Sequence, residues 1–137
     1  MHSSISGSCN CGAVSFEAAV DPAIELCCHC TDCRDATKQP YAKLAFFKKD
    51  TVEINGDRAS RVYVAESGSK TAREYCEHCG VVLFDTSEGF PRLIGVMVDN
   101  IKPPFEFKPA CHVWVRSKIP EVVIKTGMKI YEQGITT

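Results

Sequence analysis

The fold depends on two short segments, Cys9-Asn10-Cys11-Gly12 and Cys76-Glu77-His78-Cys79-Gly80. In each segment two cysteines stand one or two residues apart, a spacing that lets two sulfurs reach one ion while the backbone turns tightly. Each segment ends in glycine, which tolerates the left-handed conformation in which peptide N–H groups point at thiolates. Tetrahedral zinc needs two such pairs, so we predict one closed, structural site. Its four ligands are Cys9, Cys11, Cys76 and Cys79.

A second cysteine cluster lies between these segments, in Cys27-Cys28-His29-Cys30-Thr31-Asp32-Cys33. Cys28, Cys30 and Cys33 can occupy three corners of a tetrahedron around a second ion, which leaves one corner free. Three protein ligands and an open position are typical of catalytic zinc. Because three thiolates make the site negative, it should polarise water weakly and suit a thiol bound as the nucleophilic thiolate. We therefore predict a second, catalytic zinc and a small-molecule thiol substrate.

The spacing of the cysteines leaves other interpretations open. The first four could be buried core residues or disulfide partners, although two glycine-terminated pairs favour zinc. The second cluster could be a closed site in which Cys27 or His29 supplies a fourth ligand. Cys27 is adjacent to Cys28 on an expected strand, so it should point to the opposite face and pack in the core. No role follows for Cys111.

Two further side chains are candidates for the open site. His112 precedes Val113-Trp114 and could relay protons or shape a pocket, although lone histidines are often structural. Arg34 directly follows Cys33, where its guanidinium could hold a substrate carboxylate through two hydrogen bonds. A solvated surface arginine is the simpler alternative.

The composition excludes several classes of partner. The chain has 16 Lys and Arg against 17 Asp and Glu, with a pI near 6.4, so no basic field favours nucleic acid. Charged or polar residues interrupt every apolar run before the roughly 20 residues that a membrane helix needs. The start, Met1 to Ser8, lacks the features of a secretory signal, so we expect a cytoplasmic protein with reduced thiols.

The length of 137 residues fits one domain, 1–137, built mainly from β-strands. Residues 13–20 alternate between apolar and polar, which indicates a half-buried strand. We predict helical turns at Asp32–Thr37 and Met128–Gln133, and a hairpin across Thr51–Ala65 around Asn55-Gly56-Asp57. Further strands are expected at Ala23–Cys27, Ala42–Phe47, Thr51–Ile54, Arg61–Ala65, Ala72–Tyr75, Val81–Asp85, Leu93–Val98, His112–Val115 and Glu121–Ile124.

Several segments together resemble the glutathione-dependent formaldehyde-activating enzyme (GFA) family, whose domain also occurs in centromere protein V-like proteins. The order and separation of the segments match as well. They are Gly7-Ser8-Cys9-Asn10-Cys11-Gly12-Ala13-Val14, Cys28-His29-Cys30-Thr31-Asp32-Cys33-Arg34, Tyr75-Cys76-Glu77-His78-Cys79-Gly80, Gly95-Val96-Met97-Val98-Asp99 and His112-Val113-Trp114.

The resemblance covers a core of about residues 5–116 and implies an antiparallel β-tent fold with the two zinc sites described above. It also implies a carbon–sulfur lyase with glutathione as co-substrate, in which the thiolate of glutathione and formaldehyde combine reversibly as S-hydroxymethylglutathione. The alternative is a noncatalytic zinc-binding module that serves protein interaction or redox or metal sensing. The sequence indicates neither the oligomeric state nor the physiological substrate.

Overall fold

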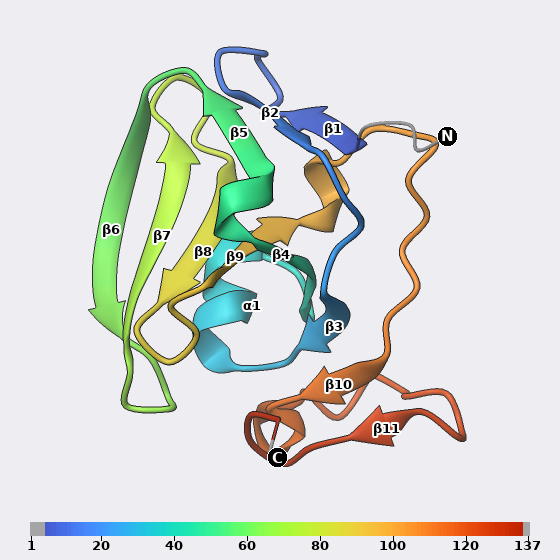
Figure 1. Cartoon of the computed structure of the whole chain (residues 1–137). Coiled ribbons are helices and arrows are strands. Elements are labelled where there is room, and N and C mark those ends of the chain that lie inside the picture. Colours follow the sequence, from blue (N-terminus) through green and yellow to red (C-terminus); the bar gives the residue numbers. More distant parts are fainter. Residues whose placement is uncertain (1–4, 136–137) are drawn as a thin grey trace.

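This computed structural model describes residues 5–135, in which the chain forms eleven strands, one α-helix and three short 3-10 helices (Figure 1). The elements in chain order are β1 (Ile5–Ser8), β2 (Ser15–Ala18), β3 (Ile24–Cys28), α1 (Thr31–Thr37), β4 (Ala42–Lys48), η1 (Lys49–Thr51), β5 (Val52–Asn55), β6 (Arg58–Val64), β7 (Lys70–Cys76), β8 (Val82–Ser87), β9 (Leu93–Met97), η2 (Val98–Asn100), β10 (Cys111–Val113), η3 (Val115–Ser117) and β11 (Lys129–Ile130). No helix within residues 5–135 is long and apolar enough to span a membrane.

The strands form two sheets. One has three strands in the order β1-β2-β5, and the other has eight in the order β11-β10-β3-β4-β9-β8-β7-β6. Most neighbouring strands are antiparallel, which confirms the predicted mainly β, antiparallel class. The exception is β10, which runs parallel to both β3 and β11.

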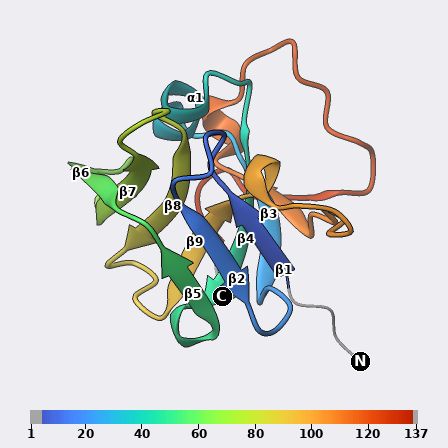
Figure 2. The same cartoon turned by 90° about the horizontal axis from the view of Figure 1, so that it is seen from above.

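The two faces of the eight-stranded sheet carry separate cores. Alternation along β4 sends Phe47 to one face and Phe46 to the other. The Phe47 face packs against the three-stranded sheet (Figure 2). There Phe16 of β2 meets Phe84 of β8 edge to face, with 5.4 Å between the ring centroids. The Phe46 face carries the core that includes Cys33 of α1. Each cysteine cluster therefore belongs to a different face of one sheet.

The predicted hairpin across Thr51–Ala65 is wrong. Asn55-Gly56-Asp57 does form a tight turn, but β5 pairs with β2 in the small sheet and β6 pairs with β7 in the large one. Gly56 has φ +103°, and a Cβ there would collide with the carbonyl oxygen of Ala13. The turn is thus a crossover between sheets, held where the backbone of the β1–β2 connection passes close by.

Two other local predictions near the C-terminus are wrong. Met128–Gln133 contains β11 instead of a helical turn, since the backbone of this segment bonds to β10. The expected strand at Glu121–Ile124 is irregular, and its residues are half-buried or exposed. Lys118 Nζ donates a hydrogen bond to the carbonyl oxygen of Val122 at 2.7 Å. The predicted helical turn at Asp32–Thr37 is confirmed as α1.

Candidate metal centre and adjoining cavity

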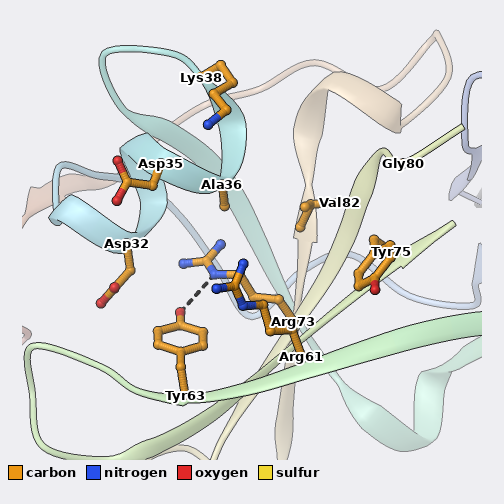
Figure 3. Close-up of a pocket in the computed structure, with 10 residues that line it drawn as sticks. All are labelled: Asp32, Asp35, Ala36, Lys38, Arg61, Tyr63, Arg73, Tyr75, Gly80 and Val82. Atoms are coloured by element: carbon orange, nitrogen blue, oxygen red, sulfur yellow. Dashed lines mark hydrogen bonds between the residues drawn. The ribbon is translucent and has the colours of Figure 1, made fainter. Parts of the chain in front are cut away.

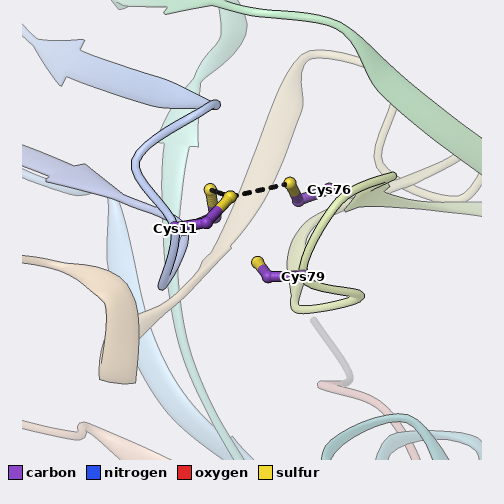
Figure 4. A group of neighbouring side chains, drawn as sticks. Cys11, Cys76 and Cys79 are labelled. Carbon is purple, nitrogen blue, oxygen red and sulfur yellow. Dashed lines mark hydrogen bonds between the residues drawn. The ribbon is translucent and has the colours of Figure 1, made fainter.

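The sulfurs of Cys9, Cys11, Cys76 and Cys79 gather between the β1–β2 connection and the β7–β8 turn (Figure 4). All four lie within 4.8 Å of one another. Cys11 Sγ is 3.6 Å from Cys9 Sγ and 3.6 Å from Cys76 Sγ. Zinc–sulfur bonds of about 2.3 Å give a tetrahedron with edges of roughly 3.8 Å. The group therefore has the size and chemistry of a closed zinc–thiolate site.

Both halves of this group have the predicted turn geometry. Gly12 and Gly80 adopt φ +82° and +75°, and their amides donate to the carbonyls of Cys9 and Cys76 at 3.2 and 2.9 Å. The amide of Val14 points at Cys9 Sγ at 3.3 Å. Burial raises the pKa of Cys9, but this amide and the neighbouring thiols outweigh burial and bring it to about 6. The sulfur of Cys9 is thus prepared to bind a metal as the thiolate.

The second group consists of Cys28, Cys30 and Cys33, again with all sulfurs within 4.8 Å of one another. Cys28 ends β3, Cys30 is the N-cap of α1, and Cys33 lies in the first turn of that helix. Cys28 Sγ and Cys30 Sγ are 3.4 Å apart, and the Cys30 sulfur accepts the amide of Cys33 at 3.3 Å. The sulfur that caps the helix is thus also a member of the three-thiol group. Three buried thiols in this arrangement fit three corners of a zinc site.

Neither candidate for a fourth ligand belongs to this group. Cys27 pairs with His112 in the β3–β10 ladder, one position from Cys28 and so on the other face. His29 is fully buried, and its Nε2 lies 2.8 Å from His112 Nδ1. Cys111 packs in the same core as these three cysteines but lies outside their group. All nine cysteines are free thiols, so the disulfide alternative receives no support.

Arg73 is the site residue that the sequence analysis missed. It lies in β7, is only 6% exposed, and donates from Nη2 to Cys33 Sγ at 3.2 Å. The neighbouring thiols and the charge of Arg73 hold the pKa of Cys33 well below its usual range. The expected strand Ala72–Tyr75 contains Arg73, but a strand pattern alone does not say that a buried arginine faces a thiolate.

A cavity of about 570 Å³ adjoins this arginine, between α1 and strands β6 to β8 (Figure 3). This volume lies in the usual range for small-molecule sites. Five charged side chains line it, three cationic and two acidic: Arg61, Arg73, Lys38, Asp32 and Asp35.

Within the cavity, Arg61 and Arg73 stand directly opposite each other in the β6–β7 ladder. Like charges in that position repel, and this cost is offset if an anion binds between them. Asp85 faces Arg73 from β8, but burial raises the pKa of Asp85 to about 7, against the opposing effect of Arg73. Its carboxyl therefore neutralises the pair only in part.

The structure places His112 away from the sulfurs of the open group. The rings of His29, His112 and Tyr41 contact one another. His29 lies between Cys28 and Cys30 in the sequence and so connects these three rings to the open group. Burial is the largest cause that lowers the pKa of both histidines, that of His29 to about 4. Both rings are therefore neutral near pH 7.

Arg34 does not line the cavity. It lies close enough to His29 for its charge to help lower the pKa of that ring, and its buried Nε has no hydrogen-bond partner. On α1 the cavity is instead lined by Asp32, Asp35 and Lys38, among others.

Comparison with known proteins identifies the family. The model of the family described as "Glutathione-dependent formaldehyde-activating enzyme" matches residues 4–117. Among solved structures, the crystal structure of a Rhodobacter sphaeroides protein is similar in fold, with a TM-score of 0.56 and 19% sequence identity over 92% of this chain and 98% of that chain. The comparison with curated proteins finds no match. Since the family model spans most of the chain and both cysteine groups, the protein belongs to the glutathione-dependent formaldehyde-activating enzyme family.

Proposed function

We propose that this protein is a zinc-dependent carbon–sulfur lyase that acts on a thiol adduct such as S-hydroxymethylglutathione. The observation that carries the proposal is the open three-thiol group whose Cys33 is bonded to an arginine of a charged cavity. A noncatalytic module for protein interaction would need neither an open thiol group nor a charged cavity beside it. Family membership supports the same class of chemistry.

The metals are assigned by the fit of the sulfurs. Cys9, Cys11, Cys76 and Cys79 would hold a structural zinc, and Cys28, Cys30 and Cys33 a catalytic one. A zinc ion in the second group would lower the pKa of an incoming thiol and so supply it as the thiolate.

The reaction itself balances simply. The sulfur of the thiolate forms a bond to the carbonyl carbon of formaldehyde, the π electrons of the C=O bond move to oxygen, and oxygen takes a proton from water. The reverse direction breaks the carbon–sulfur bond and releases the aldehyde.

The cavity gives a thiol such as glutathione its binding groups. Lys38 and Arg61 would pair with its carboxylates, while Asp32 and Asp35 would pair with its ammonium group. Arg34 was predicted for the carboxylate role, but Lys38 and Arg61 are better placed for it because they line the cavity.

His112 was expected to relay protons or to shape a pocket. Its ring hydrogen-bonds to that of His29, which stands between Cys28 and Cys30 in the sequence. We propose that His112 thereby orients the segment from Cys28 to Cys30 and leaves the adduct untouched.

The experiment measures exchange between glutathione and S-hydroxymethylglutathione by NMR, since the uncatalysed reaction also proceeds. The protein should accelerate exchange, and Cys30→Ala should return it to the uncatalysed rate. Cys111→Ala is the matched control, because Cys111 packs in the same core but lies outside the metal group. Equal exchange rates for Cys30→Ala and the unmodified protein would favour the noncatalytic module.

A further inference from the structure

One buried donor beside the open group is unused by any contact described so far. The guanidinium of Arg73 is fixed at two points. Its Nε donates to Tyr63 Oη at 2.8 Å (Figure 3). Its Nη2 donates to Cys33 Sγ at 3.2 Å. Its third nitrogen, Nη1, is buried and has no hydrogen-bond partner. A buried, charged donor without a partner in the protein is costly, so its partner is expected to be a water or a ligand atom.

The surroundings of Nη1 restrict what that ligand atom can be. Arg73 lines the cavity, so a small molecule can approach it. Nη1 and Nη2 share one carbon, which keeps Nη1 within one guanidinium width of Cys33 Sγ. An atom bonded to Nη1 would therefore lie near the three-thiol group.

The charges around Nη1 favour a ligand atom that is a negatively charged oxygen. Arg61 faces Arg73 across the β6–β7 ladder, and the two cations favour an anion between them. The carboxyl of Asp85 does not satisfy this need, because its buried Oδ1 also lacks a partner and its burial favours the neutral form.

We propose that Arg73 is a catalytic residue whose Nη1 donates a hydrogen bond to the aldehyde oxygen. This inference rests on the proposed lyase function. As the thiolate sulfur bonds to the carbonyl carbon and the C=O π electrons move to oxygen, the guanidinium stabilises the oxyanion until water supplies its proton. In the reverse direction it stabilises the same oxygen as the carbon–sulfur bond breaks.

The same side chain thus links two parts of the reaction. Nη2 holds the Cys33 thiolate and Nη1 holds the oxygen, while Tyr63 prevents rotation of the fork. Lysine keeps the charge but presents no rigid fork, so it cannot serve both atoms at once.

The test compares Arg73→Gln and Arg73→Lys with Arg58→Gln. Arg58 is a matched control, since it lies on neighbouring β6 and is half-buried in an ion pair with Glu74 away from the cavity. Loss of one oxyanion donor costs about 10²- to 10³-fold in kcat. We expect such a loss in Arg73→Gln, a smaller one in Arg73→Lys, little change in KM for glutathione, and full kcat in Arg58→Gln. Each protein is first shown by metal analysis to keep both zinc ions.

A second measurement does not depend on turnover. [¹³C]Formate is a one-carbon anion whose oxygens carry negative charge, as the oxygen of the developing oxyanion does. Its NMR signal should respond to the unmodified protein and to Arg58→Gln but not to Arg73→Gln. Unchanged kcat and unchanged formate binding in zinc-replete Arg73→Lys and Arg73→Gln would overturn the role of Arg73 and leave the lyase proposal intact. Absence of turnover in the unmodified protein would instead overturn the lyase proposal.

Discussion

At the residue scale, single side chains serve two purposes in this protein. Cys30 caps α1 and completes the three-thiol group, and Arg73 holds the Cys33 thiolate while it lines the cavity. The spacing of the cysteines predicted both groups, because ligand geometry is local in sequence. The sequence did not reveal Arg73 as a site residue, because its place in the site depends on a contact with Cys33, 40 positions away.

The buried histidine pair makes stability depend on pH. Burial, followed by the charge of His112, lowers the pKa of His29 to about 4, whereas an unfolded histidine titrates near 6.5. Between these values the unfolded chain binds more protons, so stability is full above pH 6.5 and falls as the pH drops toward 4. One pKa unit corresponds to about 1.4 kcal/mol.

Lowering the pH from 7.5 to 5.5 should therefore reduce the free energy of unfolding of both proteins. We expect this reduction to be smaller in His29→Gln than in the unmodified protein, by about 1 kcal/mol. Denaturant unfolding of both zinc-loaded proteins at the two pH values measures this difference. The same pH-dependent fall in both proteins would show that His29 does not titrate as described.

At the scale of elements, the turns follow contacts that a local pattern does not reveal. Asn55-Gly56-Asp57 is a turn, as its residues indicate, but the strands on either side pair in different sheets. Strand type was readable from alternation, while strand partners depend on packing between the sheets. The two-residue β11 exists only because β10 pairs with it, so its own sequence carried no signal.

Gly56 and Gly68 form a matched pair for testing the crossover. Both have positive φ, +103° and +88°, but a Cβ at Gly56 meets the Ala13 carbonyl whereas a Cβ at Gly68 meets open space. Gly68→Ala should cost about 1–2 kcal/mol of unfolding free energy from backbone strain alone. Gly56→Ala should cost clearly more, because the small sheet must move. Equal costs in denaturant unfolding would contradict the crossover contact.

Glu66, in the β6–β7 turn, ties three elements together. Its carboxylate accepts the amide of Thr31 at the start of α1 at 2.8 Å and the hydroxyl of Ser117 at 3.0 Å, with Arg116 at 3.6 Å. Glu66→Ala should lower the free energy of unfolding by about 1.5–3 kcal/mol, the range for hydrogen bonds to a charged group. Glu88→Ala is the control, since exposed Glu88 accepts a single amide in a neighbouring turn and should cost less. An equal loss in both variants would argue against the three-way contact.

At the scale of the whole molecule, the large sheet separates the four-thiol group from the three-thiol group. The four-thiol group joins the core between the two sheets, and the three-thiol group lies in the core on the opposite face. Spacing predicted this division into a closed and an open group, but only the fold assigns them to different faces. That 1–137 form a single domain stays a prediction, which limited proteolysis of the zinc-loaded protein would check.

The central claim is that the chain binds two zinc ions, one saturated by four thiolates and one held by three. X-ray absorption of the purified protein, together with metal analysis, tests this directly. We predict two zinc ions per chain with an average of about 3.5 sulfur neighbours, rising to about 4 when glutathione is added. One zinc ion per chain would contradict the account. So would two zinc ions whose average number of sulfur neighbours stays the same when glutathione is added.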